Sequence, residues 1–121
     1  PAGIPIEAVE DILDYEEISE ETAKTGNFFA LRIKGSSMYP LIIENDIVIV
    51  KKQDSIDSGQ IAIVMVNGDE ATCKKVIKKD NGIMLSGYNP EFVPLYYSAA
   101  EIESKPVRII GKVIEIRRSL N

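Results

Sequence analysis

The chain has 121 residues, of which 45% are hydrophobic and 27% are charged, and its formal net charge at pH 7 is −5. This length and composition are those of a single globular domain with a hydrophobic core, and the net negative charge argues against direct binding of nucleic acid. The longest apolar run, residues 61–66, is far too short to span a bilayer, so no membrane segment is expected.

The N-terminal segment is acidic and irregular. Residues 1–23 carry eight acidic side chains and no basic ones, which most simply indicates a solvated segment. Prolines at positions 1 and 5 and the glycine between them predict an extended path without helix. Residues 6–18 are ambiguous, because Ile6, Val9 and Leu13 have helical spacing while their neighbours alternate poorly.

From Asn27 onward the hydrophobic pattern is that of β-strands separated by turn residues. Asn67-Gly68 and Asn81-Gly82 lie between apolar runs and predict hairpins, because both residue types tolerate positive φ. Asn89-Pro90 and Pro94 indicate an irregular crossing. The expected strands are 28–34, 47–51, 60–66, 70–78, 83–87 and 107–117.

The first of these strands runs into the stretch Lys34-Gly35-Ser36-Ser37-Met38-Tyr39-Pro40. Gly35 and Pro40 interrupt strand pairing, so two serines are expected on a turn with unpaired amides nearby. A serine hydroxyl is a weak nucleophile without a base. The chain contains no histidine, which excludes Ser-His-Asp and Cys-His arrangements. The remaining base that works near neutral pH is a lysine whose charge is suppressed by burial.

Lys74 is a candidate for this base because it lies in the middle of the β-prone run 71–77. Its pKa would have to fall from a reference value of about 10.4, and partial burial would lower it. Thr72, two residues earlier on the same strand face, could donate or accept a hydrogen bond with the amine. Taken alone, Lys74 could equally be a solvated strand lysine, and spacing alone does not choose between Ser36 and Ser37 as nucleophile.

Gly35-Ser36-Ser37-Met38, followed by Ala71-Thr72-Cys73-Lys74-Lys75-Val76, resembles the LexA and phage-repressor self-cleaving family of S24 peptidases. The resemblance covers nearly the whole chain. It implies that Ser37, the serine before Met38, is the nucleophile and that Lys74 is the base. It also implies self-cleavage at an Ala-Gly bond, which in this chain is Ala2–Gly3.

The resemblance further implies the fold, which is a mostly β domain of twisted, partly barrel-like sheets, of the LexA C-terminal type, with at most one short helix. An extended path over 6–18 would lead into that helix, near Ser19 to Thr25, with Ser19 as N-cap and Gly26 after its end. Residues 1–26 would be a cleavage-site tail and lead-in, and residues 27–121 the peptidase and dimerisation domain. Asn45-Asp46 replaces the family's usual Gly-Asp, and the turn should survive because asparagine also adopts the left-handed conformation.

The remaining chemistry is limited. Backbone amides of Ser37 and Ser36 are the expected oxyanion donors. Cys73, next to Lys74 in a strand, should face the opposite side and is interpreted as a small core residue. A single cysteine cannot form an internal disulfide, which fits a reducing cytoplasm. No metal-ligand cluster or phosphate loop stands out, so no cofactor or metal is expected.

By resemblance, the complete protein would be a transcriptional repressor of the DNA-damage (SOS) response, inactivated by its own cleavage. An upstream helix-turn-helix domain would bind operator DNA, and a RecA–single-stranded DNA filament would stimulate cleavage. The resemblance also implies that residues 107–114 form a homodimer contact. The apolar residues of this strand, Val107, Ile109, Ile110, Val113, Ile114 and Ile116, exceed what one buried face requires, which is consistent with a second covered face. The alternatives are a polymerase-associated mutagenesis subunit of the same family, a signal peptidase I, whose motif is similar to residues 37–40, and a catalytically silent dimerisation module.

Overall fold

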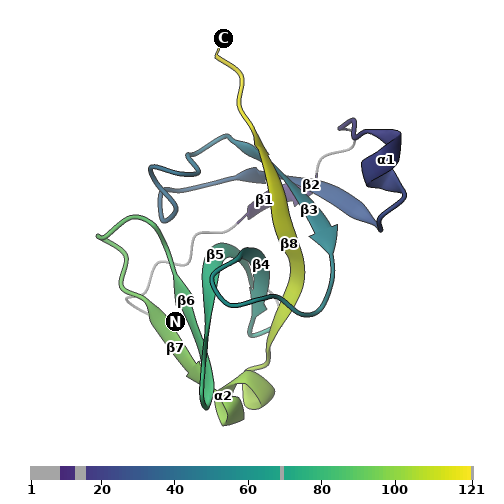
Figure 1. Cartoon of the computed structure of the whole chain (residues 1–121). Helices are drawn as coiled ribbons and strands as arrows, with labels where there is room; N and C mark the ends of the chain where they lie inside the picture. The colour runs from purple at the N-terminus through teal and green to yellow at the C-terminus, as the bar shows by residue number, and fades with distance from the viewer. Residues whose placement is uncertain (1–8, 13–15, 69, 121) are drawn as a thin grey trace.

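The structure is a computed structural model that describes residues 9–12, 16–68 and 70–120. Strands dominate these ranges and two short helices accompany them (Figure 1). None of the helices in this part of the chain is long and apolar enough to cross a membrane. The elements are β1 (Val9–Ile12), α1 (Glu20–Ala23), β2 (Phe28–Ile33), β3 (Ile47–Lys52), β4 (Ile61–Val66), β5 (Glu70–Lys79), β6 (Gly82–Ser86), β7 (Leu95–Ser98), α2 (Ala99–Ser104) and β8 (Val107–Arg117).

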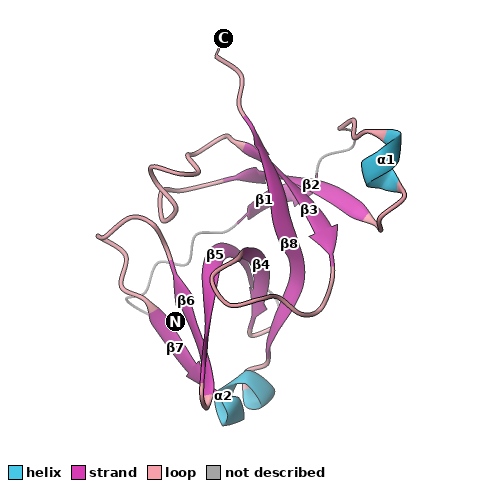
Figure 2. Ribbon diagram, viewed as in Figure 1, coloured by secondary structure: helices cyan, strands magenta, loops and turns pink. Residues whose placement is uncertain are grey.

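The strands form one antiparallel sheet in the order β1-β2-β3-β8-β4-β5-β6-β7. The long strand β8 lies in the middle, and β1 and β7 are the edges, so the sheet is twisted but not closed into a barrel (Figures 1 and 2). The mostly β fold is thereby confirmed, and all six expected strands are present within a residue or two of their predicted ends.

The expectation of at most one short helix needs correction, because the described part of the chain contains two, α1 and α2. The helix that was not predicted, α2, begins with a capping box. The Ser98 hydroxyl accepts a hydrogen bond from the Glu101 amide, and the Glu101 side chain accepts one from the Ser98 amide. The predicted helix α1 is present, and its N-cap is Ser19 as expected, with Thr22 N donating to Ser19 Oγ at 3.1 Å.

Both predicted hairpins are present, but only one for the expected reason. Asn67 and Gly68 have φ of 58° and 78°, so the turn between β4 and β5 uses two left-handed residues. Gly82 instead belongs to β6, where an added Cβ would collide with the carbonyl oxygen of Tyr97 on β7. A glycine is needed at position 82 because β7, the edge strand, approaches its backbone this closely. Asn45 has φ of 75°, so the turn that replaces the family's Gly-Asp is retained.

Two buried clusters show how far the sheet curls. The first joins Leu31 on β2 to Val48 on β3, Ile63 on β4 and Cys73 on β5, although three strands separate β2 from β5 in the sheet. Apolar residues on strands this far apart can share one core only if the sheet bends round on itself. The second cluster, under β7 and α2, includes Val76, Leu85 and Tyr97. The curl brings the end of β2 and the middle of β5 toward one another.

The apolar excess on β8 is largely explained within one chain. Register shifts opposite β3 and β4 bulge this strand, so that its side chains change faces along its length. Ile110, Val113 and Ile116 pack against the first cluster, while Val107 and Ile109 belong to the second. Among the six apolar residues of β8, the exposed one is Ile114, whose exposed fraction is 40%. The number of apolar residues on β8 is therefore not in itself an argument for a dimer.

Candidate active site

Ser37 lies on the turn that leaves the end of β2. The chain is anchored there by Met38 and Ile42, which are both buried in the first core cluster. Ser37 is itself only 2% exposed, whereas Ser36 is exposed. The sequence could not choose between the two serines, but their surroundings in the structure differ, because only Ser37 points its side chain into the protein.

The Lys74 amine is the partner of the Ser37 hydroxyl. Lys74, 6% exposed in the middle of β5, donates from Nζ to Ser37 Oγ at 2.9 Å and to Thr72 Oγ1 at 2.7 Å. Thr72 and Lys74 share a strand face, while Cys73 between them packs in the core on the other. The structure thus brings together Ser37, Lys74 and Thr72, three residues that sequence reasoning had selected.

The loop at residues 87–89, which the sequence did not single out, contacts the serine turn. The carbonyl oxygen of Ser37 accepts hydrogen bonds from the amides of Tyr88 and Asn89, both at 3.0 Å. Asn89 Nδ2 donates to the Ser36 carbonyl at 3.0 Å. An added Cβ at Gly87 would collide with the Ser37 carbonyl oxygen, so the loop approaches the turn as closely as only a glycine allows.

These contacts determine which backbone groups of the turn remain available. The carbonyls of Ser36 and Ser37 are occupied, whereas the amides of Ser36, Ser37 and Met38 donate no hydrogen bond within residues 9–12, 16–68 and 70–120. Amides held in place beside a hydroxyl, with no acceptor of their own, are the kind of donor that stabilises a developing oxyanion.

An ion pair between the buried Asp46 and the partly exposed Arg118 supports the other side of the turn. Asp46, 1% exposed at the start of β3, accepts from Arg118 Nε at 2.6 Å and Nη2 at 2.7 Å, and from the Ile43 amide at 2.9 Å. Burial acts to raise the pKa of Asp46, but the hydrogen bonds from Arg118 and Ile43 outweigh it and hold this pKa below its ordinary value. The carboxylate therefore stays ionised and keeps the chain between Ser37 and β3 in place.

Cys73 is not a candidate nucleophile. Burial raises the pKa of its thiol to about 12, although the neighbouring Lys74 acts in the opposite direction. The thiol is therefore neutral at all ordinary pH values, and the thiolate is the reactive form.

We expect Cys73 in the folded protein to react with iodoacetamide at pH 8 at least a hundredfold more slowly than in the same chain unfolded in guanidinium chloride, as followed by intact mass. Burial both blocks access and favours the neutral thiol. Equal rates in the two states, with circular dichroism showing a folded protein, would contradict the core assignment.

The predicted cleavage site, Ala2 and Gly3, lies outside the described residues. The nearest described segment is β1, which runs antiparallel to β2 with Val9 opposite Ile33 and Ile12 opposite Leu31. The N-terminal end of β1 therefore lies beside the end of β2 that leads into Ser37. β1 also contacts β5, the strand that carries Lys74.

Comparison with known proteins shows that the domain is a serine peptidase. More narrowly, the chain belongs to the peptidase S24-like family, whose model matches residues 1–114. Its relatives include the LexA repressor of Bacillus velezensis, 38% identical over 99% of this chain and 56% of the relative. LexA repressor 1 of Geobacter sulfurreducens is 39% identical over 98% of this chain and 57% of the relative. The chain thus spans little more than half the length of these relatives.

Proposed function

We propose that this chain is the self-cleaving domain of a LexA-like or prophage repressor and that a dyad of Ser37 and Lys74 cuts its own Ala2–Gly3 bond. The observation that carries the proposal is the 2.9 Å contact between two buried side chains, Lys74 Nζ and Ser37 Oγ. A buried amine is more easily held neutral than an exposed one, and a neutral amine can accept the hydroxyl proton. Thr72 Oγ1, at 2.7 Å, orients the amine.

The reaction has two halves. Ser37 Oγ attacks the carbonyl carbon of Ala2 while its proton passes to Lys74, and the amides of Ser37 and its neighbours stabilise the oxyanion. The carbon–nitrogen bond then breaks, Lys74 returns the proton to the Gly3 amine, and Ala2 remains as an ester on Ser37. Water, deprotonated by Lys74, hydrolyses this ester and restores the serine.

The bond can reach the dyad of its own chain. Val9 pairs with Ile33, and Ser37 lies four residues further along, at most about 14 Å away. Val9 lies seven positions after Ala2, and an extended chain of that length spans up to about 25 Å. Pairing of β1 with β2 keeps this tether short, so its effective concentration at the site is high. The arrangement supports cleavage within one chain.

The test is the identity of the product. Only two residues precede the bond in this sequence, so the chain should carry additional residues before Pro1 to give the acyl side strand contacts. After incubation at alkaline pH we expect a C-terminal fragment that begins at Gly3, identified by intact mass. The first-order rate constant of its formation should be independent of protein concentration. A fragment with a different first residue would refute the site, and an apparent first-order rate constant that rises with concentration would mean that one copy cuts another.

In the cell, this domain would act in the cytoplasm as part of a repressor, joined to an upstream helix-turn-helix domain that binds operator DNA. A RecA–single-stranded DNA filament would stimulate the cut, which separates the DNA-binding part from the dimerising part. The similarity to the LexA repressors supports this context.

A homodimer through β8 is part of the same proposal, supported by the family resemblance and by the exposed Ile114. Sedimentation equilibrium at high micromolar concentration should give twice the chain mass. Ile114→Asp should shift it toward monomer, because a charge would be buried in the contact. Val93→Asp, at a position that is 81% exposed in the loop before β7, serves as the control for a charge placed elsewhere on the surface. A parent chain that is monomeric at this concentration would refute the dimer.

A further inference from the structure

Two consecutive arginines at the C-terminal end of β8 contact two segments that are far apart in sequence. Arg118 binds Asp46, between the serine turn and β3, and Arg117 Nη1 donates to Glu16 Oε1 at 2.8 Å. Glu16 follows β1 by four residues and thus belongs to the segment that leads from the scissile bond into the domain. We propose that Arg117 and Arg118 are positioning residues that hold the substrate segment and the nucleophile turn on one strand end. The inference rests on the proposed function above.

The Arg118 contact fixes the nucleophile side. The Arg118 guanidinium makes two short hydrogen bonds to the Asp46 carboxylate, whose second oxygen also accepts from the Ile43 amide. Arg118 Nη2 also donates to the carbonyl of Leu41 at 3.4 Å. The chain from residue 41 to residue 46 is thus tied at three points to one guanidinium and one carboxylate. A planar, two-pronged contact of this kind sets orientation as well as distance.

The Arg117 contact fixes the substrate side. Arg117 Nε also donates to Glu115 Oε2 at 3.0 Å. This second hydrogen bond holds the guanidinium in the orientation in which it binds Glu16. Both partners of this ion pair are 26% exposed. Strand β1 needs such support, since it is a short edge strand with an irregular register against β2. Holding Glu16 anchors the end of β1 that lies away from the scissile bond.

Side chains of adjacent residues in an extended chain point to opposite faces, so two neighbouring arginines can contact two different segments, here Glu16 and Asp46. β8 lies in the middle of the sheet, and its C-terminal end pairs with β3, where Arg117 lies opposite Ile47, so this end is a fixed reference for both segments. Holding both segments on one strand end reduces the conformational freedom of the substrate segment relative to the nucleophile, and so lowers the entropic cost of bringing them together. This arrangement predicts that the two arginines affect different steps, Arg117 only the docking of the chain's own tail and Arg118 the nucleophile itself.

The experiment measures cleavage within one chain and between chains, using the full chain with added residues before Pro1. For cleavage between chains, the substrate is a ¹⁵N-labelled Ser37→Ala chain, which cannot cut itself. Arg117→Ala should lower the rate within one chain about two- to fivefold, as expected for a partly exposed ion pair, and leave cutting of the labelled chain unchanged. Arg118→Ala should lower both rates about tenfold. Arg118→Lys, which keeps the charge without the planar fork, should fall between parent and Arg118→Ala, and it serves where the alanine variant does not fold.

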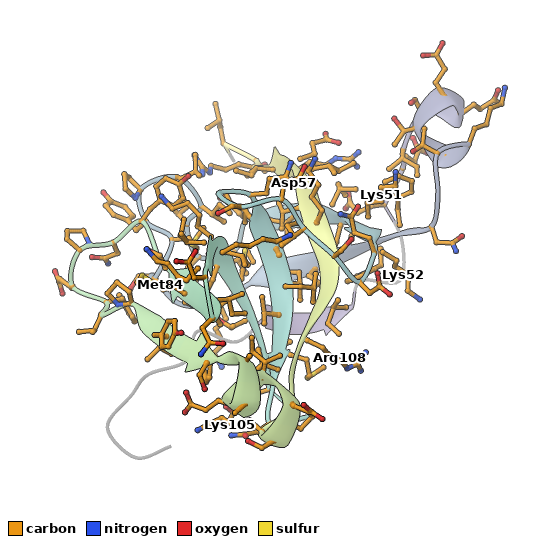
Figure 3. The ribbon with its side chains drawn as sticks, turned by 60° about the horizontal axis from the view of Figure 1, so that its bottom comes forward. Lys51, Lys52, Asp57, Met84, Lys105 and Arg108 are labelled. Carbon is orange, nitrogen blue, oxygen red and sulfur yellow. The ribbon has the colours of Figure 1, made fainter. Side chains whose placement is uncertain are left out.

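Arg108→Ala is the matched control, since Arg108 lies on the same strand, is exposed, and projects outward from the sheet (Figure 3). It should match the parent in both assays. If Arg117 acts through Glu16, then Glu16→Gln and the double variant should show the same loss as Arg117→Ala, without addition. Unchanged cleavage in Arg117→Ala, or an equal loss in both assays, would overturn the proposal while the parent still cleaves. A parent that does not cleave at all would instead refute the proposed function.

Discussion

Replacing Ser37 by alanine is expected to abolish self-cleavage, lowering its rate by more than about a thousandfold, because no other group can form the acyl intermediate. The fold should change little. Met38 and Ile42 anchor the turn in the core, and its carbonyls are held by the loop after β6, so neither support involves the hydroxyl. The measurement is intact mass after incubation at alkaline pH, with circular dichroism and thermal melting on the same samples.

Ser36→Ala is the matched control. Ser36 is adjacent and chemically identical, but it is exposed, and its carbonyl, not its hydroxyl, makes the contact with Asn89. It should cleave within about twofold of the parent. Loss of cleavage in Ser36→Ala with activity retained in Ser37→Ala would reverse the assignment of the nucleophile.

The sequence predicted the strands that lie inside the sheet. Strands such as Ile61–Val66 pair on both sides, and a burial pattern then appears directly in the sequence. The missed elements are at the edges. β7 has four residues, and β1 pairs with one neighbour only, so tertiary packing and not local pattern determines them. The capping box of α2, Ser98 to Glu101, was readable in advance, since serine followed three residues later by glutamate is a local signal.

The candidate site also has residues that the sequence predicts and residues that it does not. Ser37 and Lys74 could be predicted because each lies in a short motif, and because the absence of histidine restricts the possible bases. Gly87, Asn89, Asp46 and Arg118 were not selectable. Their roles arise from contacts across 50 to 72 positions, such as Asn89 to Ser36 and Arg118 to Asp46. Such contacts depend on how the sheet curls, which no local pattern specifies.

Replacing Lys74 is expected to have an effect as large as the loss of Ser37, and the pH dependence should show why. In the parent, the rate should rise by up to about tenfold per pH unit from neutral pH, for as long as deprotonation of the amine limits the reaction. Lys74→Ala should lower the rate more than about a thousandfold and remove this dependence, because hydroxide alone does not replace a base held 2.9 Å from the hydroxyl. The measurement is the rate of fragment formation from pH 7 to 10.

Two further variants separate the base from the charge. Lys74→Met fills the buried position without an amine, so it should fold as the parent does and remain inactive. Lys74→Arg keeps a cation beside Ser37 and Thr72 but cannot lose its proton at these pH values, and it should be as inactive as the methionine variant. Activity in Lys74→Arg would mean that a positive charge near the serine is sufficient. A parent rate that is flat from neutral to strongly alkaline pH, in a protein still folded by circular dichroism, would remove Lys74 as the titrating base.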